Sequence, residues 1–524
     1  MASECCAVKA LPEGTLTGGP STISRVNSRS AECTPADPTP ELRIPTSART
    51  FLWSYVRRRP WQFLLLLALI VVGASCSVGV QYGMKLIVNA MATGDRASRD
   101  IWHPLALFIA LITAESVCWR LGGWRGCHFV VATGVDVRLD LFRHLSGHSQ
   151  GYFSEQLAGS LGNRITATAG ATGAVLGTMI WKILPPCIDF LGAVVVLVTV
   201  DWRMVVTLVA FVTLVGAVMA RLSMRAGPLH HKFADEASRV GGELVDVVSN
   251  MWTVQAFAAR EREYCRLQAA VGKEAQAQRN SWLFLEKTRV LHDVCLWVMA
   301  GGMLLWAVQS WRAGHIMPGD VVLISALTFR ILHGSRELAL SLVDGSQQLG
   351  VISEMLRVVA VPHHVADKHD APAFVPGAGE ICLSNVSFSY GDGRPVFSDL
   401  NLTIPAGQRI GVVGPSGAGK STLIGLIQRL ADASAGCVKI DGQAVTDVKQ
   451  DSLRSAIAVV PQEIALLHRS VMDNIRYGRP DATDAAVRAA SHAAHCDGFI
   501  AALPHGYDTL VGERGMRLSG GQRQ

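Results

Sequence analysis

The feature that most constrains this chain is an uncharged apolar run near its start. Residues 61–84 contain 24 consecutive positions without Asp, Glu, Lys or Arg. A helix of about 20 apolar residues crosses the hydrocarbon layer of a bilayer, where backbone groups must be satisfied internally. Only 17% of all residues are charged, against about 25% in ordinary soluble domains. These observations exclude a purely soluble protein as the starting hypothesis.

Five further candidate spans follow the first one. The second contains Glu115, the third contains Lys182 and Asp189 one heptad apart, and the sixth contains several charges. We therefore predict an all-α membrane domain of six helices over residues 51–350. The five later spans are residues 104–119, 171–200, 204–220, 294–311 and 321–342.

The distribution of basic residues predicts the orientation of these spans. Arg57, Arg58 and Arg59 precede the first span, and residues 221–289 contain 11 Lys or Arg, whereas the connections on the opposite side carry few. Positive residues are enriched on the cytoplasmic side. We expect a multi-pass protein of the plasma (inner) membrane with both termini in the cytoplasm.

The remaining segments differ in composition. Residues 1–50 are rich in Gly, Ser, Thr and Pro without apolar periodicity, which predicts a disordered cytoplasmic tail. The connections 120–170 and 221–290 show helical periodicity, and are either long arms or separate surface helices. Residues 351–379 indicate a linker by their Pro, Gly and His content, and a soluble α/β domain is expected over residues 380–524.

Charge and cysteine content exclude several other classes. The net charge of +6 is spread over 48 basic and 42 acidic residues, too dilute to indicate nucleic-acid binding. The 12 cysteines are scattered, without a CxxC pair or a Cys/His cluster in the sequence. We therefore expect neither a zinc site nor a disulfide framework.

A phosphate-binding motif lies in the C-terminal domain. The segment GPSGAGKST matches the pattern GxxxxGK[ST], between a β-branched run, RIGVV, and an apolar helical pattern. Glycines allow successive amides to face the phosphates, Lys420 reaches the β and γ phosphates, and Ser421 binds Mg²⁺. The cofactors expected are ATP and Mg²⁺. The predicted ATP-binding residues are Gly414, Pro415, Ser416, Gly417, Ala418, Gly419, Lys420, Ser421 and Thr422.

Further motifs make a specific resemblance. Tyr390 lies 24 positions before Gly414, Gln462 follows the run VVP, and TLVGERG precedes LSGGQ. With the six spans and the P-loop, these segments make the chain from residue 51 to 524 resemble the half-transporters of the ABC exporter family. The resemblance implies six membrane helices followed by one α/β P-loop NTPase domain.

The resemblance also assigns roles to individual residues. It implies that Tyr390 stacks on adenine and that Gln462 senses Mg²⁺ and the γ phosphate. Residues 509–515 correspond to the loop beside the transmembrane arms, and residues 151–165 and 252–263 to the two coupling helices, with Phe153 and Phe257 as packing points or as core residues. The signature segment would close over the nucleotide of the opposite subunit. Its residues are Leu518, Ser519, Gly520, Gly521 and Gln522.

Against the family pattern, the chain ends directly after the signature. The catalytic Glu, the Walker B strand and the switch His of the family cannot be assigned, so we expect a fragment or a truncated product with an incomplete NTPase domain. Because the missing strand would lie beside the P-loop strand, an apolar face is expected to be uncovered.

Ionisable residues in the spans are candidates for a translocation cavity, because charge inside a bilayer is costly. In the sixth span Arg330, His333, Glu337 and Asp344 recur at helical spacing, and the third span adds Lys182. Either these groups line a cavity for an amphipathic anion, or they pair with one another or lie where the helices leave the bilayer.

The leading hypothesis is ATP-driven export of an amphipathic or lipid-like substrate. One P-loop and one signature per chain require a second half-transporter, identical or different, within the lipid bilayer. The alternatives are a non-hydrolysing ATP-binding regulatory subunit or an inactive fragment, and an importer, which the fused order of the domains disfavours.

Overall fold

The computed structural model describes residues 44–92, 101–155, 158–390, 393–461, 466–512 and 518–523. The chain divides into two compact units, which are described separately. The first comprises residues 1–140 and 171–360, and the second comprises residues 141–170 and 361–524. The N-terminal segment 1–43 lies outside the described residues, and the first helix begins at Ala48.

The first unit is all helical. Within the described residues, five helical segments are long and apolar enough to cross a membrane. The predicted sixth span is the helix α10, which is not among these five. Its sequence is less apolar, because it contains charged residues such as Arg330, Arg336 and Glu337. The helices are α1 (Ala48–Arg58), α2 (Pro60–Ala92), α3 (Trp102–Ser146), α5 (Ala158–Thr178), α6 (Leu184–Val198), α7 (Trp202–Ser249), α8 (Met251–Ala256), α9 (Arg260–Arg312) and α10 (Pro318–Val359).

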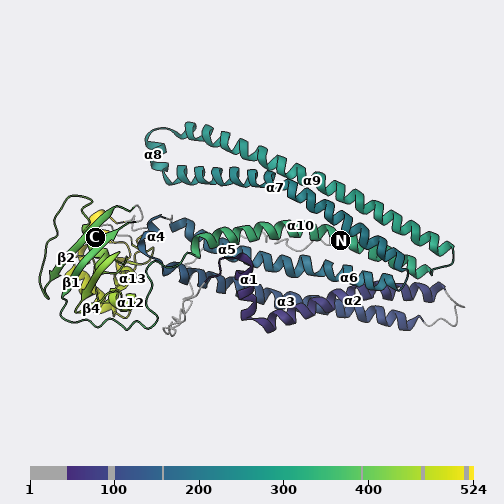
Figure 1. Cartoon of the computed structure of the whole chain (residues 1–524), viewed down its shortest axis with the longest axis horizontal. Helices are drawn as coiled ribbons and strands as arrows, with labels where there is room; N and C mark the ends of the chain where they lie inside the picture. The colour runs from purple at the N-terminus through teal and green to yellow at the C-terminus, as the bar shows by residue number, and fades with distance from the viewer. Residues whose placement is uncertain are drawn as a thin grey trace, which may run out of the picture. The chain divides into compact units, whose positions relative to one another are not determined.

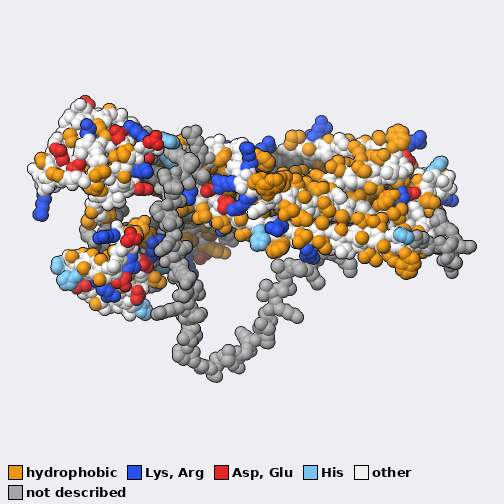
Figure 2. Space-filling view, turned by 90° about the horizontal axis from the view of Figure 1, so that it is seen from below, with side chains coloured by type: hydrophobic (Ala, Val, Ile, Leu, Met, Phe, Trp, Pro, Cys, Tyr) orange, Lys and Arg blue, Asp and Glu red, His pale blue; other side chains and the backbone are white. Residues whose placement is uncertain are grey.

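Long helices in this unit pack along their length. In Figure 1, α7 and α9 run side by side and are joined through the short helix α8. A buried core contains Leu197, Leu208, Met303 and Leu327, contributed by α6, α7, α9 and α10. Other apolar side chains of the spans point outward, and Figure 2 shows them gathered over the helices. An apolar outer surface is what a lipid environment requires.

The third span contains a local change of helix type. Residues Met179–Ile183 form a π turn between α5 and α6, in which the Leu184 N–H donates to the Met179 carbonyl. Pro185 and Pro186 follow at the start of α6 and have no N–H to donate. The wider turn therefore coincides with the position at which the ordinary hydrogen-bond ladder is interrupted.

Charged side chains of the first unit pair between helices. Lys85 of α2 lies 2.7 Å from Asp320 of α10, and both side chains are largely buried. Arg58 of α1 lies 2.6 Å from Asp140 of α3, whose carboxylate also accepts a hydrogen bond from the Tyr55 hydroxyl at 3.0 Å. Burial raises the pKa of Tyr55, so this hydroxyl remains protonated and acts as the donor.

The second unit is built on an antiparallel sheet. Its strand order is β2-β1-β3-β4, with β1 pairing both β2 and β3. The sheet and α11 enclose a core that includes Leu383, Val386, Leu423 and Val438. The strands are β1 (Ile381–Ser389), β2 (Pro395–Ile404), β3 (Ala435–Ile440) and β4 (Gln443–Ala444). The helices are α4 (Gln150–Glu155), α11 (Lys420–Ile427), α12 (Gln450–Ser455), α13 (Val471–Arg476), α14 (Asp484–Ala493), α15 (Asp497–Ala501) and α16 (Gly520–Arg523).

The predicted linker is more structured than its composition suggested. Its first residues complete α10, which ends at Val359. Farther along, Val365, Ala371 and Phe374 are buried, and Asp367 pairs with the buried guanidinium of Arg429 at 3.0 Å. Sequence composition missed this packing because the anchoring residues are isolated among polar ones.

The strand predicted before the P-loop is not formed. Residues 409–413 belong to no strand, and Val413 is 95% exposed rather than buried. Val460, in a second β-branched run, is also exposed. No strand among the described residues pairs with either run, and the apolar side chains of both runs are exposed.

Candidate nucleotide-binding site

The P-loop connects the end of β2 to the start of α11. Gly417 and Gly419 adopt φ values of 84° and 90°, a left-handed conformation that favours glycine. At Gly419, a Cβ would lie 2.7 Å from Val396 Cγ1 and 2.9 Å from Phe397 Cζ. Both the backbone angle and the close approach to β2 therefore require glycine at this position.

Lys420 is held by the loop itself. Its Nζ atom donates to the carbonyls of Gly414 and Pro415, each at 2.8 Å. These two acceptors are neutral carbonyls rather than carboxylates, so the positive charge of Lys420 stays available for an anion. Lys420 and Ser421 begin α11, whose N-terminal amides and dipole also favour negative charge.

Tyr390 contacts the motif directly. Its hydroxyl lies 2.8 Å from the Thr422 hydroxyl, and its ring packs edge-on against Phe388 at 5.0 Å. The ring is more than half exposed. The structure thus brings together Tyr390 and the P-loop, which the sequence had paired only through family resemblance.

The signature segment forms a reciprocal helix cap. The Ser519 N–H donates to the Gln522 side chain at 2.9 Å, and the Gln522 N–H donates to the Ser519 hydroxyl at 3.3 Å. This is the capping-box arrangement at the start of α16. Leu518 is buried against Val471 and Ile500, which anchors the segment. Gln462 and residues 513–517 lie outside the described residues.

The candidate cavity residues do not form one cluster. Arg330 pairs with Asp189 of α6 at 3.0 Å, and Asp344 accepts a hydrogen bond from Thr178 at 3.4 Å. Side-chain pairing, the alternative considered from the sequence, thus accounts for Arg330. Lys182, His333 and Glu337 are exposed, and their facing a cavity stays a prediction.

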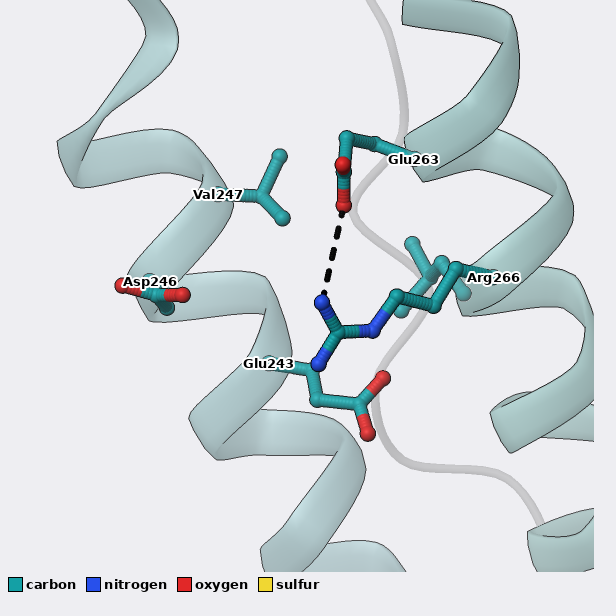
Figure 3. A pocket seen from close by; sticks show the side chains of 6 residues that line it. Glu243, Asp246, Val247, Glu263 and Arg266 are labelled. Atoms are coloured by element: carbon teal, nitrogen blue, oxygen red, sulfur yellow. Dashed lines mark ion pairs between the residues drawn. The ribbon is translucent and has the colours of Figure 1, made fainter. Parts of the chain in front are cut away.

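The segments that resemble coupling helices are short helices at the ends of long ones. In α4, Phe153 is partly exposed, whereas Trp252 and Phe257 at α8 are 79% and 75% exposed. Beside α8, a small hollow lies between α7 and α9. Figure 3 shows Arg266 there, pairing with Glu263 at 4.0 Å and pointing toward Glu243. The exposure of Phe257 excludes core burial as its role within the first unit.

One group of residues was missed from the sequence. The side chains of His144, His148 and His363 meet in the second unit, with potential ligand atoms all within 4.8 Å of one another. The sequence did not predict this cluster, because its members come together only in three dimensions. The only sequence signal was the i, i+4 spacing of His144 and His148, because His363 comes from a distant segment.

Two family models match the chain. Residues 63–336 match the ABC transporter transmembrane region, and residues 397–524 match the family described as ABC transporter. The first match alone spans just over half of the chain.

Individual relatives agree with these matches. An ATM1-type heavy metal exporter of Novosphingobium aromaticivorans is 29% identical, over 90% of this chain and 79% of its own length. An ATP-dependent lipid A-core flippase of Desulfotalea psychrophila is also 29% identical, over 74% of this chain and 68% of its own. A solved structure of a bacterial Atm1-family ABC exporter with ATP bound superimposes with a TM-score of 0.79 at 26% identity, covering 89% of this chain and 82% of that one.

Proposed function

This chain belongs to the ABC transporter family, as a half-transporter with a fused transmembrane region and ATP-binding domain, and from that premise we propose that it works as a dimeric, ATP-driven exporter. The observation that carries the proposal is one P-loop and one signature segment on one chain. A P-loop and a signature from opposite subunits would enclose each nucleotide, so two chains are needed for two complete sites. The partner is an identical chain or a second half-transporter.

The residues of the P-loop fit an ATP–Mg²⁺ complex. Lys420 would exchange its carbonyl partners for phosphate oxygens, and the exposed Ser421 hydroxyl would hold Mg²⁺ together with Gln462. Tyr390 would stack on the base from its exposed position beside Thr422. When bound, ATP supplies the free energy of domain closure and transport.

For the substrate we propose an amphipathic anion of lipid-like character. Lys182 places an exposed basic group in the third span. On α10, Arg330 is neutralised by Asp189, and His333 and Glu337 add exposed polar groups. The related proteins include one named as a heavy metal exporter and one named as a lipid A-core flippase. The anionic amphiphile is favoured here because the exposed ammonium of Lys182, rather than a thiolate or thioether, lies among the candidate cavity residues.

The dimer is tested by its mass with and without ATP. The protein in lipid nanodiscs is expected to give particles containing two 56.2 kDa chains when ATP and Mg²⁺ are added. The Lys420→Ala variant is the control, because it should remain insensitive to ATP. Wild-type particles that stay monomeric with ATP bound would refute the exporter proposal.

The substrate class is tested by asking which compounds stimulate ATP turnover. In proteoliposomes, anionic lipid analogues are expected to stimulate ATP turnover or ATP-dependent closure, and Lys182→Gln should weaken that response. Arg312→Gln, at the exposed end of α9, is the matched control for loss of one positive charge. Stimulation by heavy-metal ions with no response to lipids would instead favour the chemistry named for the heavy metal exporter.

The proposed location is the plasma (inner) membrane with both termini cytoplasmic. Two observations support it: the basic residues that precede α2 and the basic content of residues 221–289. A cysteine probe at the end of α1 should be reachable only from the cytoplasmic side, whereas one introduced at Ala313 should be reachable from the opposite side. The reverse pattern would overturn the orientation.

A further inference from the structure

Three imidazoles converge where the chain leaves α3. His144 lies in the last turn of α3, His148 lies in the turn that follows it, and His363 comes from the segment after α10. All three belong to the second unit. One potential ligand atom from each lies within 4.8 Å of the other two. Residues 219 positions apart in the sequence thus share one site.

The approach of His363 depends on a glycine. A Cβ at position 147 would lie 2.8 Å from His363 Cε1 and 3.1 Å from its Nε2. These distances are shorter than ordinary van der Waals contacts, so any larger residue would displace the ring. Gly147 therefore opens the space that the His363 ring occupies against the end of α3.

The hydrogen bond of His363 identifies which of its ring nitrogens carries the proton. His363 Nε2 lies 2.9 Å from the His144 carbonyl oxygen. A carbonyl can only accept, so Nε2 carries the proton and the neutral ring keeps its lone pair on Nδ1. Metal-binding histidines commonly donate one ring N–H to a carbonyl in this way, which fixes the tautomer and the ring orientation.

Aromatic contacts fix the second ring. His148 is buried, and its ring stacks on Tyr152 with centroids 4.1 Å apart and an interplanar angle of 13°. His148 and His363 are nearly perpendicular, at 4.6 Å and 84°, whereas His144 and His363 stack at 4.5 Å. The three rings are therefore held by contacts on several sides rather than extended into solvent.

We propose that His144, His148 and His363 bind one divalent first-row transition-metal ion, with Zn²⁺ as the expected occupant. Three imidazole nitrogens suit Zn²⁺, Co²⁺ or Ni²⁺ and not Mg²⁺ or Ca²⁺. Zinc–nitrogen bonds of about 2.0–2.1 Å place tetrahedral ligands roughly 3.3 Å apart. The potential ligand atoms, which lie within 4.8 Å of one another, would move closer together to reach that spacing when the ion binds.

The proposed ion leaves one coordination position for water. His144 and His363 are half-buried, so solvent reaches the site. The ion fastens the segment around His363 to the end of α3 by bonds stronger than ring contacts. This role is independent of the proposed function, because it requires only that the second unit folds as described.

The first test is metal titration of the full chain, without a polyhistidine tag, in detergent after chelation of bound metals. Co²⁺ is the probe, because its visible d–d bands report nitrogen coordination and Zn²⁺ displaces it. We expect one Co²⁺ per chain with these bands. His363→Gln should weaken its binding by more than about 100-fold, since a direct ligand contributes at least as much as the outer contacts that cost 10- to 100-fold.

The matched control is His364→Gln. His364 is the exposed neighbour of His363 and is not part of the cluster, so its removal should leave Co²⁺ affinity unchanged. Absence of Co²⁺ binding to the wild type, or binding that is equal in His363→Gln and wild type, would overturn the proposal.

A second variant keeps all three imidazoles. Gly147→Ala should push the His363 ring away and weaken Co²⁺ binding by roughly 10-fold, while ATP binding at the P-loop stays at its wild-type level. If His363→Gln fails to fold, this variant decides the question. Wild-type Co²⁺ affinity in Gly147→Ala would contradict the geometry on which the site rests.

Discussion

The transmembrane helices and the ATP-binding domain satisfy buried charge in different ways. Among the spans, a charged side chain of one helix meets an opposite charge on another, as with Lys85 and Asp320 or Arg330 and Asp189. In the ATP-binding domain, charged side chains also bind backbone groups. Arg429 donates to the carbonyls of Val448 and Ala366 at 3.0 and 2.8 Å, as well as to two carboxylates.

The difference follows from the backbone. Within a helix, nearly all N–H and C=O groups are already used, so a charge between helices finds only other side chains. Loops around the antiparallel sheet leave backbone groups open, and Asp441 accepts from the N–H groups of Gly377, Gly379 and Glu380. Charged side chains in the ATP-binding domain can therefore organise loops, whereas the paired charges in the spans join one helix to another.

The largest effect is expected from Arg429→Met. Arg429 is almost fully buried, and its loss would remove the charge partner of Asp367 and the donor to the carbonyls of Val448 and Ala366. A broken buried charge pair costs about 3–5 kcal/mol, which lowers the unfolding midpoint of a domain of this size by roughly 10 °C. Differential scanning calorimetry of the detergent-solubilised chain measures that shift.

Lys368→Met is the control for Arg429→Met. Lys368 pairs with Asp447 in the same domain, but both side chains are more than half exposed. Exposed pairs contribute about 0–1 kcal/mol, so little change is expected. Equal destabilisation by both variants would remove the special role assigned to Arg429.

The next effect is on ATP affinity rather than stability. Lys420→Ala removes a cation whose partners in the loop are two neutral carbonyls. Charged hydrogen bonds contribute about 1.5–3 kcal/mol, so ATP should bind roughly 10- to 100-fold more weakly. Fluorescent-nucleotide titration measures the affinity, and Lys449→Ala, at an exposed loop position outside the P-loop, is the control. Unchanged affinity in Lys420→Ala would mean that the lysine does not reach the phosphates.

A smaller effect is expected in the membrane. Arg330→Met leaves Asp189 without its partner, whereas the double variant Arg330→Met, Asp189→Leu removes both charges. Coupling between polar partners in membrane helices averages about 0.6 kcal/mol and reaches about 1.7. A double-mutant cycle of unfolding free energies in detergent should give a coupling in that range. A coupling free energy of zero would mean that Arg330 and Asp189 do not stabilise each other.

The smallest effect concerns pH. The hydrogen bond from Gly377, with those from Glu380 and Gly379, lowers the pKa of Asp441 below its ordinary value. The contribution of Asp441 to the free energy of unfolding is therefore fully present above the unfolded pKa of about 3.9. It is lost as the pH falls through the lower pKa of the folded state. Asp441→Asn should lower the unfolding midpoint at neutral pH and flatten its decline in acid. An identical acid profile in both proteins would exclude this linkage.

The motifs of the site could be recognised in the sequence, whereas the nucleotide-binding roles of their residues stay predictions. The P-loop and the signature are short segments whose residues act together because they are adjacent in the chain, and the structure forms a left-handed turn at Gly419 and a cap between Ser519 and Gln522. The long apolar helices were predictable for the same reason, since hydropathy is a property of consecutive residues.

Features that depend on distant partners were not predictable. The His363 ring reaches His144 across 219 positions of the sequence, and Arg429 pairs with Asp367 of a segment that composition indicated to be a linker. The β-branched run before the P-loop has the composition of a buried strand, but Val413 is exposed because no described strand pairs with it. The composition of a run indicates its preference for the strand conformation, whereas its pairing in a sheet depends on whether another strand lies beside it.

The π turn at Met179–Ile183 has a consequence for comparing this span with others. One added residue advances the angular phase of a helix by about 100°. A helical wheel drawn without interruption from 161 to 198 would therefore assign wrong faces to everything after the turn, Asp189 included. In cysteine scanning of the span, the accessibility of the introduced thiols should vary with helical periodicity on both sides of the turn. The two periodic patterns should be shifted by one residue relative to each other. An alignment that ignores the offset would equate residues whose side chains lie on different faces of the helix.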